Sequence, residues 1–319
     1  MAVTLAQAKL NVQDDLQMGV IDEFAKSAFL LNNLIFDDVV SPTGGGTTLT
    51  YAYRRLKTQP AAEFREVNNE YASQEVEKEP VSVDLKIFGG AFKIDRVIAD
   101  MGGIVNEVQL QMEQKIKAAS ALFNDTTING DRAVNSKAFD GLDKAIAGSA
   151  TEFNATGTAL DLSTSAKIDA NYKMFLDMLD EFLMGLDGTP SFIAGNSKLI
   201  AVIRACARRT FQYQVTQNQF GQNVGSYDGI PLVDLGTKPG TNDPVVSVNI
   251  TTGETSLYAA RIGLDGFHGV APTGNSLIKT WLPDFKSSGA VKTGEVEMLA
   301  AIALKATKAA GAFRKIKVK

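Results

Sequence analysis

The chain has 319 residues and a formal net charge of −4, because 36 acidic residues slightly outnumber the 32 Lys and Arg residues. Hydrophobic residues make up 45% and charged residues 21%, which are the proportions of a folded globular protein rather than a disordered one. The only Cys and His are Cys206 and His268, which excludes a disulfide, a Cys/His zinc site and an iron–sulfur cluster within one chain. The mild acidity also argues against sequence-independent nucleic-acid binding over the whole surface.

No segment has the composition of a targeting or membrane sequence. The first 20 residues lack the basic start and the apolar run of a signal peptide. No stretch approaches the roughly 20 apolar residues of a membrane helix. We therefore expect a soluble protein that does not associate with a membrane.

The N-terminal segment predicts one helix followed by a flexible joint. Apolar residues recur at helical spacing at Ile21, Phe24, Ala25, Ala28 and Phe29. Residues 41–46, with the sequence Ser-Pro-Thr-Gly-Gly-Gly, end any helix there and allow the chain to turn.

Two predicted strands then flank a strongly acidic loop. Apolar and aromatic residues alternate with polar or small ones first at Leu49, Tyr51 and Tyr53, and then at Val81, Val83, Leu85 and Ile87. Residues 59–79 lie between the strands and contain six Glu, one Arg and one Lys, so this loop alone carries a charge of −4. The loop contains candidate residues for contact with another subunit, namely Glu63, Arg65, Glu66, Glu70, Glu75 and Glu77.

If the two strands pair as a hairpin, they form an arm that extends about 40 Å. A compact chain of this length has a radius of gyration of only about 20 Å. One interpretation is a long hairpin that folds back over its own domain. The alternative is an arm that contacts another subunit.

Three helices and several strands are predicted in the rest of the chain. The first helix spans residues 103–125, and a second apolar stripe at residues 168–186 predicts another. Asn196 is placed to cap the third helix, whose buried face would carry Leu199, Ile203 and Cys206. Strands and turns are predicted at residues 191–194, 211–215, 227–234, 278–282, 291–304 and 312–318.

The usual catalytic motifs are missing. The Gly-Gly-Gly-Thr run at residues 44–47 lacks the Lys-Ser/Thr ending of a phosphate loop, and residues 195–198 are better explained as a helix cap than as an anion site. His268 has no Gly-x-Ser-x-Gly partner and is interpreted as a hydrogen-bonded turn residue, whereas Cys206 is interpreted as a small buried hydrophobe. We therefore predict no catalytic, cofactor-binding or metal-binding residues and expect a protein that is not an enzyme.

Two clusters of basic residues have two possible interpretations. Arg204, Arg208 and Arg209 lie on or beside the polar face of the third helix, and the C-terminal segment contains Lys305, Lys308, Arg314, Lys315, Lys317 and Lys319. Solvated faces are the default interpretation. Under the alternative, one cluster receives the acidic loop of a neighbouring subunit, which would make the three arginines contact residues as well.

Four segments follow one another in a characteristic order. They are Gly-Gly-Ala-Phe-Lys-Ile-Asp at 89–95, Phe-Asn-Asp-Thr-Thr-Ile-Asn-Gly-Asp at 123–131, Phe-Asp-Gly-Leu at 139–142 and Tyr-Asp-Gly-Ile-Pro-Leu-Val-Asp-Leu-Gly at 227–236. With the arm before them and the basic, extended C-terminus behind them, their order resembles that of a tailed-bacteriophage major capsid protein of the Hong Kong 97 type. The resemblance covers nearly the whole chain.

This resemblance implies an α+β shell subunit with the Hong Kong 97-type capsid fold, divided into four parts. Residues 1–46 would form the N-arm, and residues 47–99 would form the extended E-loop hairpin. The peripheral domain would combine residues 100–147, including the spine helix at 103–125, with residues 275–319. Residues 148–274 would form the axial domain.

The resemblance also implies a function and partners. Copies of the chain would form pentamers and hexamers that close into an icosahedral head around double-stranded DNA, in a virion assembled in the cytoplasm of a host bacterium. A scaffolding protein, which Met1 suggests is a separate chain, and a portal would be further partners, with a decoration protein or a maturation protease in some members. An encapsulin-like shell that packages a cargo enzyme is the alternative, and an enzyme that uses only carboxylates is a third.

Overall fold

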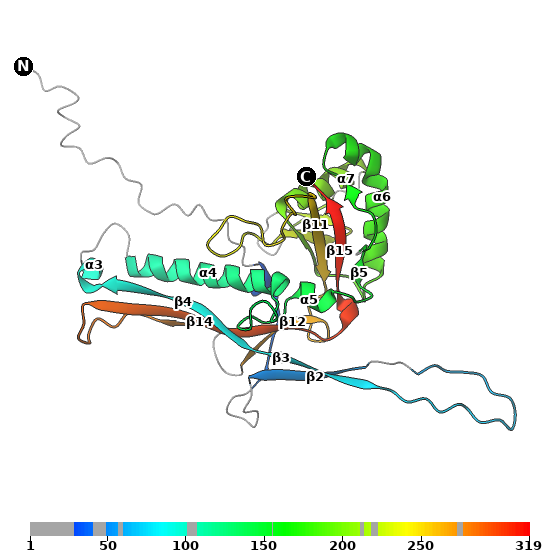
Figure 1. Ribbon diagram of the computed structural model, residues 1–319, viewed down its shortest axis with the longest axis horizontal. Helices are drawn as coiled ribbons and strands as arrows, with labels where there is room; N and C mark the ends of the chain where they lie inside the picture. The colour runs from blue at the N-terminus through cyan, green and yellow to red at the C-terminus, as the bar shows by residue number, and fades with distance from the viewer. Residues whose placement is uncertain are drawn as a thin grey trace, which may run out of the picture.

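The computed structural model describes residues 29–40, 49–56, 60–100, 107–154, 156–210, 214–217, 223–272 and 277–319. Figure 1 shows that they form a long horizontal lower body, an upper body above its right-hand part, and an arm that projects beyond both. Two sheets form the two bodies, and a separate two-stranded sheet forms the arm.

The lower body contains a five-stranded sheet. Its strands are β1 (Phe36–Val40), β12 (Phe267–Pro272), β14 (Val291–Leu304) and β13 (Ile278–Trp281) in that order, with β4 (Lys86–Asp95) also paired to β14. The helices α2 (Phe29–Asn33), α3 (Arg96–Asp100) and α4 (Glu107–Asn129) accompany this sheet.

The upper body contains an eight-stranded sheet. Its strands are β5 (Glu152–Phe153), β15 (Ala310–Lys317), β11 (Glu254–Ala260), β7 (Phe192–Gly195), β10 (Ile230–Asp234), β9 (Asn223–Tyr227) and β8 (Gln214–Gln217), and β6 (Leu160–Asp161) pairs with β15. The helices α6 (Ser165–Met184) and α7 (Ser197–Arg209) belong to this body, and the short α5 (Leu142–Ile146) and 3₁₀ helix η1 (Thr307–Ala309) lie near its base.

The length of the lower body follows from strand β14. Its residues alternate between buried and outward-facing positions up to Met298, which is typical of a strand with one covered face. It pairs antiparallel with β4 over ten residue pairs, from Val291 opposite Asp95 to Ala300 opposite Lys86. Helix α4 lies along the paired strands β4 and β14, as Figure 1 shows. It buries Met112 in the same apolar cluster as residues of these two strands.

Side-chain caps fix the starts of the two upper helices. The hydroxyl of Thr164 accepts a hydrogen bond from the amide of Lys167 at 3.3 Å, so α6 begins at residue 165. The side chain of Asn196 accepts a hydrogen bond from the amide of Leu199 at 2.8 Å and caps α7. The predicted role of Asn196 is therefore confirmed.

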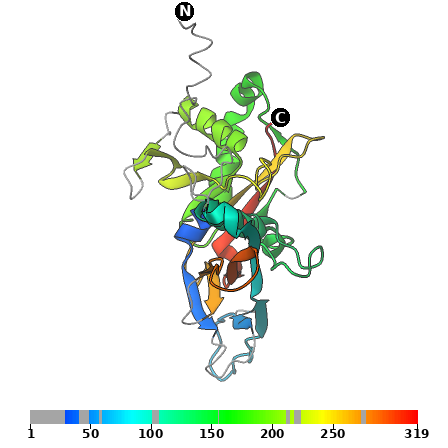
Figure 2. The same ribbon diagram turned by 90° about the vertical axis from the view of Figure 1, so that its left-hand side faces the viewer.

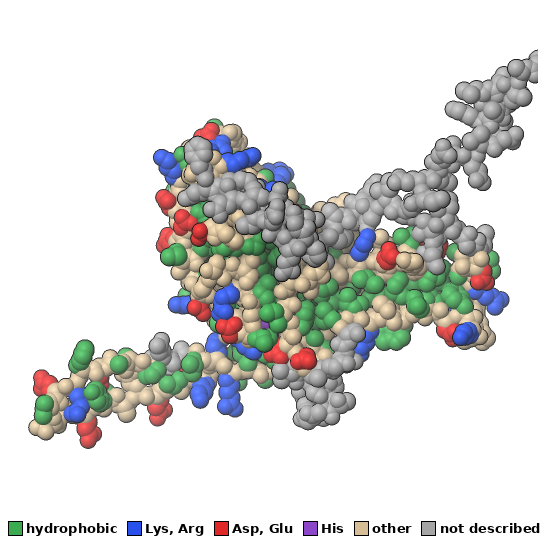
Figure 3. Space-filling model, turned by 180° about the vertical axis from the view of Figure 1, so that it is seen from behind, with side chains coloured by type: hydrophobic (Ala, Val, Ile, Leu, Met, Phe, Trp, Pro, Cys, Tyr) green, Lys and Arg blue, Asp and Glu red, His purple; other side chains and the backbone are tan. Residues whose placement is uncertain are grey.

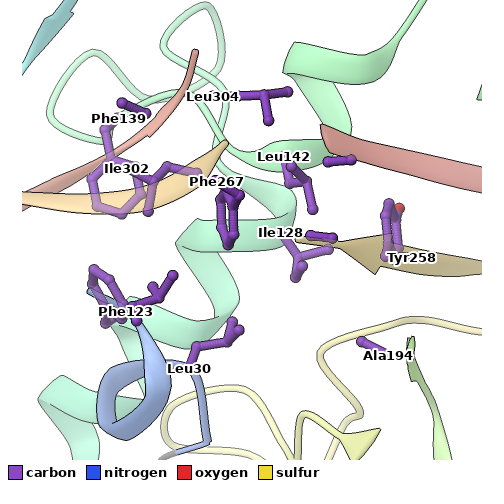
Figure 4. Close-up of a cluster of buried hydrophobic side chains, with 14 of the residues drawn as sticks. Leu30, Phe123, Ile128, Phe139, Leu142, Ala194, Tyr258, Phe267, Ile302 and Leu304 are labelled. Carbon is purple, nitrogen blue, oxygen red and sulfur yellow. The ribbon is translucent and has the colours of Figure 1, made fainter. Parts of the chain in front are cut away.

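One apolar core joins the lower and upper bodies. Figure 4 shows Phe123 and Ile128 of α4 beside Phe267 of β12, with Tyr258 of β11 and Ala194 of β7 from the upper sheet nearby. All five side chains belong to one cluster of buried residues. Because this core crosses the joint, the two bodies are tied together by hydrophobic burial.

The predicted elements agree with the structure at many positions. The predicted strand at 291–304 coincides with β14, and the predicted helix at 103–125 is α4, which spans Glu107–Asn129. The predicted strands on either side of the acidic loop pair as β2 (Thr50–Leu56) and β3 (Lys78–Asp84). The joint at 41–46 and most of the predicted N-terminal helix lie outside the described residues.

The sheet pairings differ from the grouping of segments in the predicted division. Strand β4 falls in the segment 47–99 assigned to the extended loop, yet it pairs along β14 in the lower sheet. Strand β15 falls in the C-terminal segment grouped with residues 100–147, yet it pairs with β11 in the upper sheet. Strand periodicity identifies a strand but not its partner, so the sequence did not reveal these pairings.

Candidate assembly surfaces

The arm, defined as the described part of residues 50–84, forms a sheet of its own. Strands β2 and β3 pair antiparallel over seven residue pairs, from Thr50 opposite Asp84 to Leu56 opposite Lys78. Within the described residues neither strand belongs to another sheet. Figures 1 and 3 show the arm projecting from the body into open space. Isolated two-stranded hairpins are marginally stable in water, so this arm needs further contacts to be held in one place.

The arm tip, residues 60–77, exposes large apolar side chains. Phe64 is fully exposed, Val67 is 87% exposed and Tyr71 is 61% exposed. They lie three and four residues apart, with glutamates between them. An exposed set of this kind marks an interaction site more often than an ordinary surface. These three residues were not among the sequence-based candidates, although their regular spacing was a visible signal.

Local hydrogen bonds give the tip a defined shape. The amide of Ala61 donates to the side chain of Gln74 at 2.7 Å, and the amide of Ala72 donates to the carboxylate of Glu63 at 2.9 Å. Arg65 donates to the carbonyl oxygen of Asn69 at 2.9 Å and lies over the ring of Tyr71. The predicted contact residues Glu63 and Arg65 therefore have roles within the tip. Exposed side chains are found at Glu66, Glu70, Glu75 and Glu77.

The arm root is fixed on one side by a polar cluster around Tyr51 of β2. Its hydroxyl donates to the carboxylate of Asp37 in β1 at 2.7 Å, and the ammonium group of Lys305 lies 3.6 Å from the same carboxylate. The Lys305 nitrogen also lies 5.5 Å from the centre of the Tyr51 ring. Burial and the hydrogen bond to Asp37 raise the pKa of Tyr51, so its hydroxyl stays protonated and donates.

Backbone carbonyl groups anchor the next two residues of the root. The hydroxyl of Tyr53 donates to the carbonyl oxygen of Leu304 at 2.7 Å. The guanidinium of Arg55 donates to the carbonyl oxygens of Lys305 at 3.0 Å and Leu304 at 2.7 Å. On the other strand, Asp84 forms an ion pair with Arg132 at 3.0 Å. The root thus contacts the body through both strands, whereas the tip projects away from it.

His268 lies in strand β12 beneath the arm root, and its predicted location in a turn was wrong. The residue is fully buried, and its ring meets the Tyr51 ring edge-on with 5.9 Å between ring centres. Its Nδ1 lies 3.4 Å from the carbonyl oxygen of Gly266, and its Nε2 has no hydrogen-bond partner. Burial lowers the pKa of His268, and the charge of Lys305 lowers it further.

The three arginines of α7 divide into two groups. Arg209 forms a 2.6 Å ion pair with Asp169 of α6 and also donates to the carbonyl oxygen of Ala205, so it is held within its own chain. Arg204 and Arg208 instead line a surface hollow of about 460 Å³, the α7 hollow. The Nε of Arg204 is buried without a hydrogen-bond partner. Cys206 faces the interior as predicted, and burial raises its pKa to about 11.

Much of the basic C-terminal segment is occupied by contacts within the chain. Arg314 donates to Glu152 at 3.0 Å and also pairs with Asp143. Lys305 pairs with Asp37, and Lys315 donates to the carbonyl oxygen of Gly157 at 3.1 Å. Lys308 and Lys319 are the exposed basic residues of the segment. The segment therefore does not present all of its charges to a partner.

A second hollow, of about 480 Å³, bears on the hypothesis of an enzyme that uses only carboxylates. Asp143, Glu152 and Glu254 line it. The first two are held by the same guanidinium of Arg314, an arrangement typical of a structural ion pair. Within the described ranges, no three His, Cys, Asp or Glu side chains are grouped as a metal site would need, and no helix is long and apolar enough to span a membrane.

The chain is similar in structure to known shell proteins over nearly its whole length. The SrpI encapsulin of Synechococcus elongatus PCC 7942 aligns with a TM-score of 0.67 and 15% identity, covering 99% of this chain and 97% of the encapsulin. The capsid of Myoviridae phage XM1 aligns at 0.58 with 13% identity over 99% of both chains. The capsid of a native GTA particle aligns at 0.60 with 12% identity, over 98% of this chain and 97% of that one.

These matches confirm the predicted α+β fold of the Hong Kong 97 capsid type. No protein-family model and no curated protein matches the sequence. Because the identities are only 12–15%, the comparisons establish the fold and leave the function to be argued from the chain itself.

Proposed function

We propose that this protein is a structural shell subunit that assembles with copies of itself. The observation that carries the proposal is the arm, which projects from the body and exposes Phe64, Val67 and Tyr71 at its tip. A neighbouring copy that covers these side chains would supply the burial that the chain itself does not provide. The proposed role is not catalytic.

The proposed shell is the icosahedral head of a tailed bacteriophage, built from pentamers and hexamers and enclosing double-stranded DNA. Its further partners are a scaffolding protein and a portal, and it is assembled in the cytoplasm of the host bacterium. The alignment with the phage XM1 capsid over 99% of both chains supports this proposal. The head would enclose DNA without reading its sequence.

Charge is consistent with enclosing DNA rather than gripping it. Proteins that bind the phosphate backbone tightly present many free Lys and Arg side chains to it. Here the chain is acidic overall, and the basic C-terminal residues Lys305, Arg314 and Lys315 make contacts within the chain. A shell made of this chain would hold its contents by closure.

An encapsulin-like shell that encloses a cargo protein is the second candidate function. The alignment with the SrpI encapsulin, at a TM-score of 0.67, favours it. The two candidates share the arm, the fold and the self-assembly, and they differ in the contents of the shell.

The sheet pairings support a revised domain division as part of this proposal. We assign to the peripheral domain β4, α4 and β14, which share one apolar cluster. We assign β15 to the axial domain, because it pairs with β11 there. The E-loop is then the arm, residues 50–84, rather than the whole of residues 47–99.

The contents of particles from the native source decide between the two candidates. Purified particles would be treated with nuclease, extracted, and examined for protected double-stranded DNA and for co-purifying proteins, with electron microscopy of the same sample. Protected DNA supports the phage head, and a stoichiometric cargo protein without DNA supports the encapsulin-like shell. A chain that stays monomeric at every concentration would refute both.

A further inference from the structure

The α7 hollow has an apolar floor and a basic rim. The side chains of Ile200 and Leu232 form the floor and are almost fully buried at 6% and 4% exposure. Arg204 and Arg208 line the hollow together with the single carboxylate of Asp234, so its charge is +1. Arg204 keeps a buried Nε atom without a hydrogen-bond partner. A matching partner would bring one apolar side chain and one acidic group.

A rigid turn elsewhere in the upper body has these properties. It spans residues 249–254, and Ile250 at its tip is 90% exposed. The side chain of Asn249 accepts hydrogen bonds from the amides of Thr251 at 2.9 Å and Thr252 at 3.1 Å, which fixes the turn. Glu254 is its one charged residue, so the six residues carry a charge of −1; its side chain is half-buried and lies at the edge of the second hollow, which it lines. Residues 249–254 form the Ile250 turn.

The hollow and the turn lie on opposite sides of the upper body. In Figure 2, α7 and the adjoining β8–β9 hairpin occupy the left side, and the yellow segment that leads into β11 occupies the right side. A single copy therefore cannot place its own turn in its own hollow. Two copies can, if the right side of one meets the left side of the next. A contact between different surfaces of identical chains is head-to-tail, and it closes into a ring when the rotation allows.

We propose that the Ile250 turn of one copy inserts into the α7 hollow of the next, with Glu254 close to Arg208. This inference rests on the proposed function, because it names the surfaces by which neighbouring shell subunits meet. Ile250 would bury its side chain on Ile200 and Leu232. Complementary charges at the rim would set the register of the contact.

The sequence-based hypothesis placed the acidic loop of a neighbour on one of two basic clusters, either the α7 arginines or the C-terminal segment. Figure 1 shows the arm at the lower end of the molecule and α7 at the upper end. The Ile250 turn and the α7 hollow both belong to the upper body, so two copies that meet side by side through their upper bodies can bring them together. The arm projects at the opposite end of the molecule, so in that arrangement its tip would meet another part of the neighbour.

Disulfide trapping in assembled particles tests the proposal. The variant I250C/A201C places one thiol on the turn and one on the exposed surface of α7 at the hollow. Oxidation should give a ladder of covalent multimers on a non-reducing gel, ending at the ring size. I250C alone and A201C alone are the controls, and neither should give a ladder, because the only other thiol, Cys206, is buried. The variant F64C/A201C tests the competing arm-tip contact, and a ladder from that pair alone would overturn the proposal.

A charge exchange provides the second test. R208E and E254R should each reduce the yield of assembled particles, and the double variant should restore it, because the rim contact is re-formed with reversed charges. A double variant that is no better than either single variant counts against the contact. If the wild-type chain forms shells but oxidised I250C/A201C particles give no ladder, this contact is refuted and the shell function is not. Wild-type chains that never assemble refute the shell function itself.

Discussion

The hydroxyl of Tyr51 donates a 2.7 Å hydrogen bond to the carboxylate of Asp37, and this contact joins the arm to strand β1 of the body. The same carboxylate is paired with Lys305, which follows strand β14. One partly buried polar cluster therefore links the arm to β1 and to the end of β14 in the lower sheet. These contacts fix the orientation of the arm at its root, and so a small number of contacts near the body determines the position of the distant tip.

Removing the hydroxyl of Tyr51 should weaken the arm root. Tyr51→Phe keeps the ring packed on His268 but deletes a hydrogen bond to a charged acceptor, which stabilises a protein by about 1.5–3 kcal/mol. We expect the free energy of unfolding to fall by about 1–2 kcal/mol, because Asp37 keeps its ion pair with Lys305. Urea unfolding measures the change. Tyr71→Phe, in the exposed tip, is the matched control and should be neutral.

Acidification should destabilise the arm root through His268. Its pKa in the folded protein is lowered, so below about pH 6.5 the unfolded chain binds a proton more readily than the folded one. The contribution of His268 to the free energy of unfolding is therefore fully present above that pH. It is lost as the pH falls toward the pKa of the folded protein, by at most about 1.4 kcal/mol per pH unit. Lys305 opposes the imidazolium, whereas Asp37 and Asp265 favour it, and burial outweighs both carboxylates.

The variant His268→Gln isolates this effect from other titrating groups. Unfolding free energies of the two chains, measured between pH 5 and pH 8, should differ by an amount that changes with pH below about 6.5. Both measurements belong in a background that does not assemble, because assembly adds stability of its own. Parallel curves for the two chains would show that His268 does not titrate in this window.

Neighbouring glycines in β4 should respond very differently to the same substitution. A Cβ atom on Gly89 would lie 1.9 Å from the carbonyl oxygen of Val296 in β14. The backbone of β14 cannot move aside without disturbing its pairing with β4. A Cβ atom on Gly90 would meet only the flexible side chain of Lys115, at 3.3 Å. We expect Gly89→Ala to cost about 2–3 kcal/mol of stability and Gly90→Ala well under 1 kcal/mol. Thermal unfolding of the two variants compares them directly, and equal melting temperatures would contradict the close approach of β4 and β14.

Periodicity in the sequence was enough to predict elements whose signal is local. The apolar spacing of α4 and the Asn196 cap of α7 depend on residues that are neighbours in the chain. The pairing of β15 with β11 joins residues 50 or more positions apart, and the sequence of neither strand identifies the other as its partner. The resemblance to capsid proteins therefore predicted the fold, but the grouping of the strands had to come from the structure.

For the candidate contact residues, too, the sequence alone was not enough to predict which side chains are available to a partner. Charge pointed to Glu63, Arg65 and Arg209, but the structure shows each of them in a contact within the chain. Phe64 and Val67 were overlooked because an apolar residue is assigned to the core by default, and only the structure shows that no core lies beside the arm tip. Exposure, rather than residue type, identifies these positions.

A single charge placed on the arm tip should prevent assembly without unfolding the chain. Val67 and Val134 are both 87% exposed, the first on the arm tip and the second on a loop of the body, so the two sites offer matched substitutions. If the tip is buried against a neighbour, Val67→Asp places a carboxylate in an apolar contact in every subunit, which costs several kcal/mol at each site. Val134→Asp adds the same charge to a surface that the proposal leaves in solvent, so its shells should form normally.

Sedimentation of the two variants at equal concentration measures the assembled fraction, and circular dichroism melting confirms that both chains fold. We expect Val67→Asp to lose at least nine tenths of its particles and to keep the melting temperature of the unassembled chain. Lys substitutions at Glu66, Glu70 and Glu75 together should have a smaller effect that grows at low salt, because exposed charges are screened in solution. Normal shells from Val67→Asp would show that the arm tip stays exposed in the particle. That result would contradict the proposed function, which rests on the burial of the tip by a neighbouring copy.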